Sequence, residues 1–325
     1  TISRRQRQMC IRDRPMIELG DYGHPPAIRR RDYGVVMLTL VWRMRFDLLL
    51  LLLISVLVAN GLVPRGWTGS ASAVRILGIA ASIFIGFRNT QAIGRWWEAR
   101  KLWGSVVNVS REWADTLRAH LDSSRPSGRL ERKLLRLQVA TVWQLNFQLR
   151  NFWHRDLRAF QDQLLKDLKL PSSTSLRQLG ALRGVWIGDL HREGLIDGFG
   201  RMQLMALGNA CTDAIGGLER IRNTPLPPSY DVFVRLLSWF FGVLLLVYFH
   251  DLEPTIHARV GGVVIVMMFL MAERIGAYVE GPFDSDGSSF SLPIDSICLT
   301  ISRDLLDHAT EHVQHLKSSD PVRWT

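Results

Sequence analysis

The chain has 325 residues, of which 47% are hydrophobic and 22% charged, with a formal net charge of +10 and a mean hydropathy of +0.06. This composition excludes a disordered tail, a collagen-like chain and a disulfide scaffold, but it fits soluble and membrane proteins equally. Three widely separated cysteines predict neither a disulfide framework nor a CxxC motif. What the positive charge means depends on where the basic residues lie.

The first part of the chain is rich in arginine. Residues 1–15 show no apolar period and are followed by Met16. We expect residues 1–15 to be a non-native or disordered extension without a cleavable signal peptide, and residues 16–34 to be a cytoplasmic N-terminal segment. The first apolar stretch after them would direct membrane insertion.

Four apolar runs follow along the chain, at residues 48–63, 76–87, 236–249 and 260–272. Each is shorter than the roughly 20 residues that cross a bilayer, which alone would favour buried helices of a soluble protein. However, the runs extend through tolerable residues, aromatic side chains gather at their ends, and they form two closely spaced pairs. We therefore predict two transmembrane helices within residues 35–104 and two within residues 232–281.

The basic residues predict the orientation of these spans. Residues 1–45 contain ten arginines and four acidic residues. By contrast, the connection 64–75 contains two arginines and the connection 250–259 contains one. Cytoplasmic segments carry the excess of lysine and arginine. Both termini, including residues 282–325, and the long middle segment are therefore expected in the cytoplasm.

The middle segment, residues 105–231, is predicted to be helical. Apolar residues recur every three or four positions from Leu130 to Lys169, and Pro171 with the Ser/Thr cluster at 172–175 is expected to end this helix. A second helical stretch from Gly198 to Arg222 stops before a run of prolines. Strand patterns are absent. The predicted fold class is an all-α integral membrane protein, with four transmembrane helices that extend into a large helical cytoplasmic region.

The second apolar run has two faces, each made of residues four positions apart: large Ile79, Ile83 and Phe87, and small Gly78, Ser82 and Gly86. Small residues let membrane helices approach closely, and a ring of large apolar side chains can gate a pore by dewetting. An ordinary buried helix, with the large residues in its core, would show the same spacing. Spacing alone leaves both interpretations open.

Four separated motifs narrow the choice. They are GFRN at 86–89 with RWWEAR at 95–100 and LWG at 102–104, GGLER at 216–220 with TPLP at 224–227, PF at 282–283, and LPID at 292–295 with TISRDL at 300–305. With these motifs, in order between Ile17 and His312, the sequence resembles the bestrophin family in its bacterial branch.

The resemblance implies a homopentameric ion channel of the bacterial inner membrane, contacting lipid and permeant ions, with no enzymatic activity, cofactor, metal or nucleic acid. The second span would line the pore, with Ile79, Ile83 and Phe87 as a hydrophobic neck. The small residues Gly78, Ser82 and Gly86 would form the helix-packing face beside it. A lower constriction would lie near Phe199, counted back from the GGLER motif.

Ion selectivity is less clearly indicated. Animal and plant members of the family pass anions, aided by the positive edges of aromatic rings, so we expect chloride. Glu98 lies three helical turns past Phe87, on nearly the same face, and an acidic ring there would favour monovalent cations. Alternatively, Glu98 pairs with Arg95 or Lys101 at helical spacing.

The sequence departs from the family in two places. Calcium-gated animal members carry a dense acidic run after the Pro-Phe pair, whereas here only Asp284 and Asp286 stand among serines. Because calcium favours about six to eight oxygen ligands, we predict no calcium activation. Ser302 stands where the bacterial branch commonly has glutamate, and we expect it to weaken a helix-start interaction.

Other chemistries are less favoured by the sequence. His308 and His312 have the spacing of an inverted zinc-protease motif, but a solvated helix end explains them better. Asp47 lies four residues after Arg43, which favours an ion pair at the membrane boundary. A non-conducting membrane-anchored scaffold or sensor, and a soluble nucleic-acid binder that uses the positive charge, are the competing functional classes.

Overall fold

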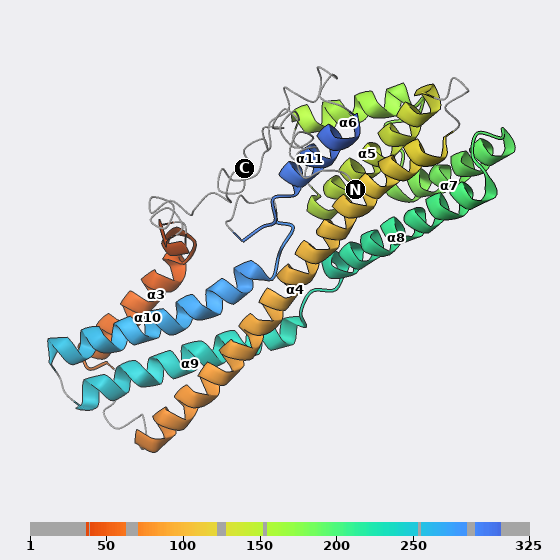
Figure 1. Ribbon diagram of the computed structural model, residues 1–325. Coiled ribbons are helices and arrows are strands. Elements are labelled where there is room, and N and C mark those ends of the chain that lie inside the picture. Colours follow the sequence, from red (N-terminus) through yellow and green to blue (C-terminus); the bar gives the residue numbers. More distant parts are fainter. Residues whose placement is uncertain are drawn as a thin grey trace, which may run out of the picture. The chain divides into compact units, whose positions relative to one another are not determined.

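The computed structural model describes residues 37–38, 40–62, 71–121, 128–151, 155–252, 255–284 and 290–306. Within these ranges the chain forms helices and no strand. The helices are α3 (Arg45–Ala59), α4 (Ala71–His120), α5 (Gly128–Arg150), α6 (Arg155–Asp167), α7 (Leu176–Arg192), α8 (Gly198–Asn223), α9 (Pro228–Leu252), α10 (Ile256–Val279) and α11 (Ile294–Leu306) (Figure 1). All of them belong to one of two compact units, residues 43–325; residues 1–42 form the other.

Three helices, α4, α9 and α10, are long and apolar enough to cross a membrane. Three of the four predicted spans lie in them. The remaining one falls on α3, which is apolar but has 15 residues and packs against α9 and α10. The predicted class, an all-α integral membrane fold, is confirmed.

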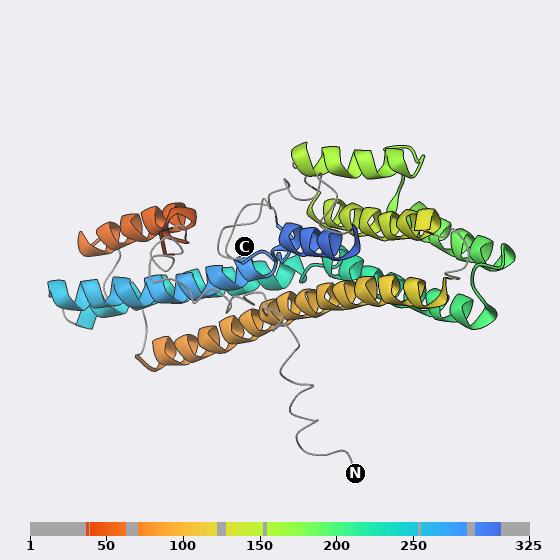
Figure 2. The same ribbon diagram turned by 45° about the horizontal axis from the view of Figure 1, so that its top comes forward.

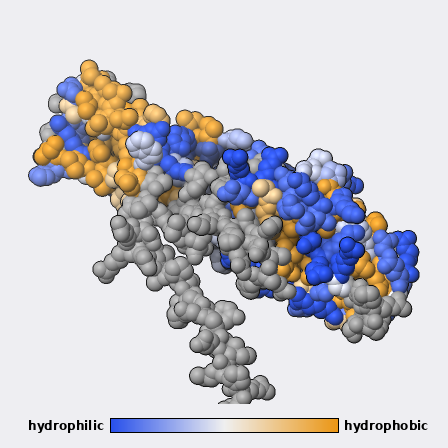
Figure 3. Space-filling model, turned by 90° about the horizontal axis from the view of Figure 1, so that it is seen from above, coloured by the Kyte–Doolittle hydropathy of each residue, from blue (hydrophilic) through white to orange (hydrophobic). Residues whose placement is uncertain are grey.

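The surface of α3, α9, α10 and the beginning of α4 is apolar. Large apolar side chains that are more than half exposed there include Leu49, Leu52, Leu53, Ile76, Leu236, Phe240, Val260 and Met268. Figure 3 shows apolar residues gathered at one end of this unit and hydrophilic residues over the other. Soluble monomers rarely expose an apolar surface of this extent, whereas a lipid bilayer solvates it.

Helix α4 runs through both the apolar end and the hydrophilic end of this unit. Its 50 residues extend about 75 Å at roughly 1.5 Å per residue. Its first part packs on α9 and α10, and its later part packs on α8, α5 and α11 (Figures 1 and 2). One continuous helix therefore connects the membrane helices to the helices around α5.

A second core, outside the membrane helices, surrounds α5. Trp103 and Trp113 of α4 and Trp143 of α5 are completely buried in it. Each indole removes roughly 200 Å² from water, which contributes about 5 kcal/mol of transfer free energy. Helix α6 lies on the outer side of α5 (Figure 2).

Two sequence predictions for this region are corrected. The single helix expected from residue 130 to 169 is two helices, because Asn151 takes a left-handed conformation (φ 51°) at the end of α5. Asparagine adopts this conformation more readily than most residues. The Ser/Thr cluster expected only to end a helix also begins α7: Ser175 accepts a hydrogen bond from the backbone N–H of Gln178 in a capping box. The helix predicted from residue 198 to 222 is confirmed as α8.

Candidate functional site

One side of α4 presents large apolar residues that no other helix of the described chain covers. Ile79, Ile83 and Phe87 are 63%, 50% and 62% exposed. Ala81 and Ile85, on the other side of the helix, are buried. The three residues expected in a neck thus share one uncovered face and do not belong to the core of this chain.

The small residues beside this face differ from one another. A Cβ atom on Gly78 would lie 2.9 Å from the ring of Phe241, so Gly78 gives α9 its close approach to α4. The hydroxyl of Ser82 donates a hydrogen bond to the carbonyl oxygen of Gly78 at 2.8 Å. A Cβ atom on Gly86 would meet no described atom within 4 Å. Within the described chain, only the first of these two glycines packs against another helix.

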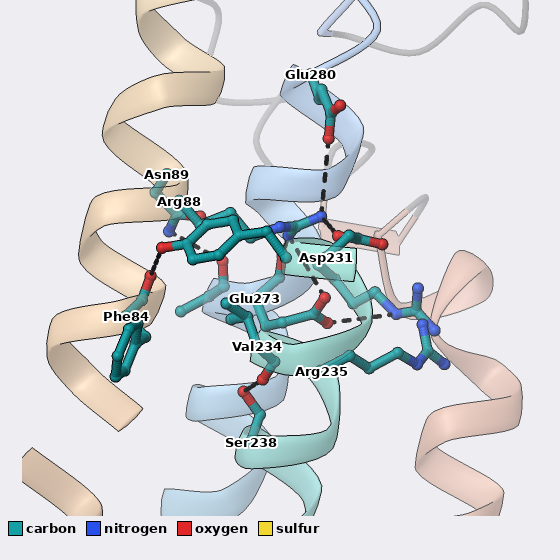
Figure 4. A network of polar contacts seen from close by, with 12 residues as sticks. Phe84, Arg88, Asn89, Asp231, Val234, Arg235, Ser238, Glu273 and Glu280 are labelled. Atoms are coloured by element: carbon teal, nitrogen blue, oxygen red, sulfur yellow. Dashed lines mark hydrogen bonds and ion pairs between the residues drawn. The ribbon is translucent and has the colours of Figure 1, made fainter. Parts of the chain in front are cut away.

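Arg88 follows Phe87 and points the opposite way, into the helix bundle. It is 1% exposed, and its guanidinium donates a hydrogen bond to the carbonyl oxygen of Glu273 at 2.8 Å. The guanidinium also contacts the carboxylates of Asp231, of Glu273 at 3.4 Å and of Glu280 at 3.9 Å (Figure 4). A buried charge costs several kcal/mol unless it is paired, and here α9 and the end of α10 supply the partners.

These ion pairs continue to α3. Arg274 Nε lies 3.8 Å from the Glu273 carboxylate and donates a hydrogen bond to Asp47 at 2.7 Å. Arg235 donates a second hydrogen bond to Asp47 at 3.0 Å. We call the seven residues of these ion pairs the charged network: Asp47, Arg88, Asp231, Arg235, Glu273, Arg274 and Glu280. It joins α3, α4, α9 and α10 beside the exposed apolar face.

The expected ion pair between Asp47 and Arg43 is not formed. Asp47 is buried and faces the bundle, where the arginines of α9 and α10 reach it. The guanidinium of Arg43 lies 5.0 Å from the centre of the Tyr278 ring. Sequence spacing pointed to the nearest charge along the helix, whereas burial selected partners from other helices.

Asn89 completes the inward face of the GFRN motif. Its side-chain amide donates a hydrogen bond to the carbonyl oxygen of Ala272 at 3.1 Å. A Cβ atom on Gly276 would lie 2.0 Å from Asn89 Oδ1, so any larger residue at that position of α10 would force the Asn89 side chain to move. Of the motif, Phe87 therefore points out of the bundle while Arg88 and Asn89 fix α4 to α9 and α10.

The RWWEAR motif fastens α4 to the end of α8. Arg95 donates hydrogen bonds to the carbonyl oxygens of Thr224 and, at 2.7 Å, of Ile221. Glu98 accepts a hydrogen bond from Arg220 at 2.6 Å, rather than pairing with its helical neighbours Arg95 and Lys101. The RWWEAR motif and the GGLER motif, which are far apart in the sequence, thus lie against each other. The carboxylate of Glu98 is paired with the guanidinium of Arg220.

Phe199 lies at the other end of α4. It is the second residue of α8, is 60% exposed, and its ring centre lies 5.9 Å from that of His120. His120 is the last residue of α4, about 50 Å along the helix from Phe87 at 1.5 Å per residue. Phe199 of α8 therefore lies beside the last residue of α4, far along that helix from the exposed apolar face.

Ser302 is not at a helix start as expected. It is buried in the interior of α11, where its hydroxyl donates to the carbonyl oxygen of Cys298 at 2.8 Å and accepts from Trp143 Nε1 at 3.0 Å. A hydroxyl is small enough to accept the hydrogen bond of the buried indole N–H at this position.

Among the described residues no group of histidine, cysteine or acidic side chains is arranged to hold a metal ion. Residues 1–15, Asp286, His308 and His312 lie outside the described residues.

Known proteins resemble this chain over most of its length. The sequence matches the family model described as Bacterial/Fungal Bestrophin protein over residues 28–307. It is 30% identical over 237 residues to the voltage-dependent anion channel-forming protein YneE of Escherichia coli, covering 71% of this chain and 74% of that protein. It is also 30% identical over 240 residues to the voltage-dependent anion channel-forming protein RSc3414 of Ralstonia nicotianae, covering 73% of this chain and 78% of that one.

Solved structures agree with the fold. A crystal structure of a bacterial bestrophin homolog from Klebsiella pneumoniae, which carries a point mutation, superposes with a TM-score of 0.72 at 27% sequence identity. The match covers 82% of this chain and 98% of that one. Since the family model extends from the residues before α3 to the end of α11, the chain is a member of the bacterial and fungal bestrophin family.

Proposed function

We propose that this protein is a homopentameric channel of the bacterial inner membrane that conducts small anions, chiefly chloride. The observation that carries the proposal is the exposed apolar face of α4, formed by Ile79, Ile83 and Phe87. In the pentamer this face surrounds the pore axis and forms a hydrophobic neck. A narrow apolar tube loses its water readily, so the neck sets whether ions pass.

The packing of the subunit supports this arrangement. Helices α9 and α10 pack on one side of α4, and α3 packs on α9 and α10, so the membrane helices of one subunit lie away from the exposed face. Five copies placed around that face would turn α3, α9 and α10 towards lipid. The small residues Ser82 and Gly86, which are open in the single subunit, would then contact the adjacent copy.

The orientation and the second constriction follow from the same assembly. Both termini and the helices α5 to α8 and α11 lie in the cytoplasm, where five copies enclose a vestibule. The exposed Phe199 narrows the lower end of this vestibule. The chain acts by conduction, and no step in this scheme requires a catalytic group or a cofactor.

Anion selectivity is supported by two observations. The relatives named above are voltage-dependent anion channel-forming proteins. In addition, Glu98 is bound to Arg220, which cancels the charge of an acidic ring at that level. A monovalent-cation channel of the same architecture is the alternative, and it requires Glu98 to act as an unpaired carboxylate.

Planar-bilayer recording of the purified protein under a potassium chloride gradient tests the proposal. We expect the reversal potential to shift from zero towards the equilibrium potential of chloride. A shift towards the equilibrium potential of potassium would favour the cation channel. The absence of any current, together with a monomer or dimer in detergent, would favour a non-conducting scaffold or sensor.

The neck is tested separately with Ile83→Ala. The shorter side chain widens and wets the neck, so we expect a larger single-channel conductance with the pentamer intact. Met268→Ala, at an exposed apolar position of α10, is the matched control and should conduct like the parent. Equal conductance of the parent and Ile83→Ala would contradict the neck assignment.

A further inference from the structure

A basic cleft lies where the first turns of α5 meet the end of α6. Its volume is about 570 Å³, and its walls carry the side chains of Arg129, Arg132, Lys133, Arg136, Asp167 and Lys169. Leu130 of α5 and Leu168, which directly follows α6, form the rest of its lining. The channel described above does not use this cleft.

Most of the positive charge in the cleft is not compensated. Arg136 lies 3.4 Å from Asp167, and this is the only ion pair between the cleft residues. Across the ranges that the structure describes, no carboxylate lies within 4.0 Å of the side-chain nitrogens of Arg129, Arg132, Lys133 or Lys169. Lys133 Nζ instead lies 3.9 Å from the centre of the Trp186 ring. Five cations and one carboxylate leave a formal charge of about four positive units, a field that attracts anions.

Two backbone features add to this preference. Helix α5 begins at Gly128, so the positive end of its dipole lies beside Arg129. Lys169, just after α6, has φ 59°, a left-handed conformation in which glycine is the residue most often found after a helix. The left-handed conformation is unfavourable for a lysine backbone, and it places the ammonium group of Lys169 on the wall of the cleft.

We propose that this cleft binds a linear polyphosphate, either free or as the phosphate chain of a nucleotide. Successive phosphoryl groups carry charges in a row, and the guanidinium forks of Arg129, Arg132 and Arg136 suit bidentate contacts with phosphate oxygens. The volume of about 570 Å³ falls in the range of small-molecule sites, roughly 300–1,000 Å³. A single chloride or orthophosphate would leave most of the charge unmatched.

The position of the cleft excludes the headgroups of the surrounding bilayer. Arg118 of α4 lines the adjoining hollow together with Arg132 and Arg136. Arg118 is thirty residues beyond Arg88, which is about 45 Å along α4 at 1.5 Å per residue. The ligand therefore comes from the cytoplasm, and its binding does not depend on the proposed conduction.

Isothermal titration of the purified full-length protein in detergent tests the proposal. We expect the affinity to rise from orthophosphate through diphosphate to inorganic triphosphate, and to fall as sodium chloride is raised. Arg132→Gln combined with Lys169→Gln should weaken triphosphate binding about tenfold or more. A double variant that binds triphosphate as tightly as the parent, or equal affinities for orthophosphate and triphosphate, would overturn the proposal.

The matched control is Arg177→Gln combined with Arg303→Gln, which removes the same charge at exposed positions outside the cleft. It should bind triphosphate like the parent, and a tenfold loss here would show that net charge alone is responsible and would also overturn the site. ATP in a parallel titration distinguishes the sources: binding equal to that of triphosphate indicates that the phosphate chain alone is recognised, and tighter binding indicates a nucleotide. Circular dichroism and the elution volume of each variant verify that it is folded.

Discussion

The membrane helices and the core around α5 place their residues in opposite ways. In the membrane helices, charged groups such as Arg88 and Glu273 are buried while large apolar side chains are exposed. In the core around α5, three tryptophans are buried, while arginines such as Arg129 and Arg132 are exposed. The solvent of each region explains the difference. Lipid solvates exposed apolar side chains, whereas water favours their burial in a core.

The largest effect is expected from breaking the charged network. Arg88→Ala removes the partner of Glu273, Asp231 and Glu280 and leaves the buried carboxylate of Glu273 with only the more distant Arg274. Breaking a buried ion pair in this way costs about 3–5 kcal/mol. Thermal unfolding of the purified protein in detergent should show a large loss of stability. Arg75→Ala, at an exposed position of the same helix, should leave the transition unchanged, and equal stability of the two variants would contradict a structural role for the network.

A loss of similar size is expected in the core for the opposite reason. Trp143→Ala leaves a large apolar cavity and removes the hydrogen bond that Ser302 accepts, which together cost about 3–5 kcal/mol. The exposed Trp97 is the matched control, and Trp97→Ala should change stability by less than about 0.5 kcal/mol. Limited proteolysis of the helices around α5 measures the difference, and equal cleavage rates for both variants would show that Trp143 is not essential for the core.

A smaller effect is expected where α10 touches α4. Gly276→Ala places a methyl group against Asn89 and should cost about 1–3 kcal/mol through overpacking. Gly261→Ala, on the same helix with open space around it, should be neutral or slightly stabilising. Adding Asn89→Ala to Gly276→Ala removes the clash and should recover part of the loss in thermal stability. No recovery would place the cause elsewhere.

The smallest effect is expected at the exposed ion pair between α4 and α8. Glu98→Gln removes its interaction with Arg220, and exposed pairs contribute about 0–1 kcal/mol. Stability should hardly change, and the reversal potential under a salt gradient should stay near that of the parent. A shift of the reversal potential towards the chloride equilibrium value would instead indicate that Glu98 attracts cations in the pore.

Local pattern predicted the parts of the fold that local forces decide. The apolar runs identified α4, α9 and α10, and the proline run after Arg222 marked the end of α8. The break at Asn151 was missed because a single left-handed residue leaves the apolar period on both sides intact. The start of α7 was missed because a serine cluster reads equally well as an end or as a cap.

The site was predictable only where its residues repeat along one helix. Ile79, Ile83 and Phe87 share a face because of their spacing, so their common exposure could be expected. The partners of Arg88 lie 143, 185 and 192 residues away in the sequence. No spacing rule reaches that far, and the only signal was the presence of charged residues at the ends of apolar runs.

The unbroken course of α4 has a mechanical consequence. The helix contains no proline, and it is anchored by the charged network near one end and by the tryptophan-rich core near the other. Helix α4 therefore moves as one rigid element and does not bend at a hinge. A tilt of about 3° about the network would move the far end by roughly 2–3 Å over the about 50 Å that separate Phe87 from His120. A movement of α4 near Phe87 therefore also displaces the end of the helix beside Phe199.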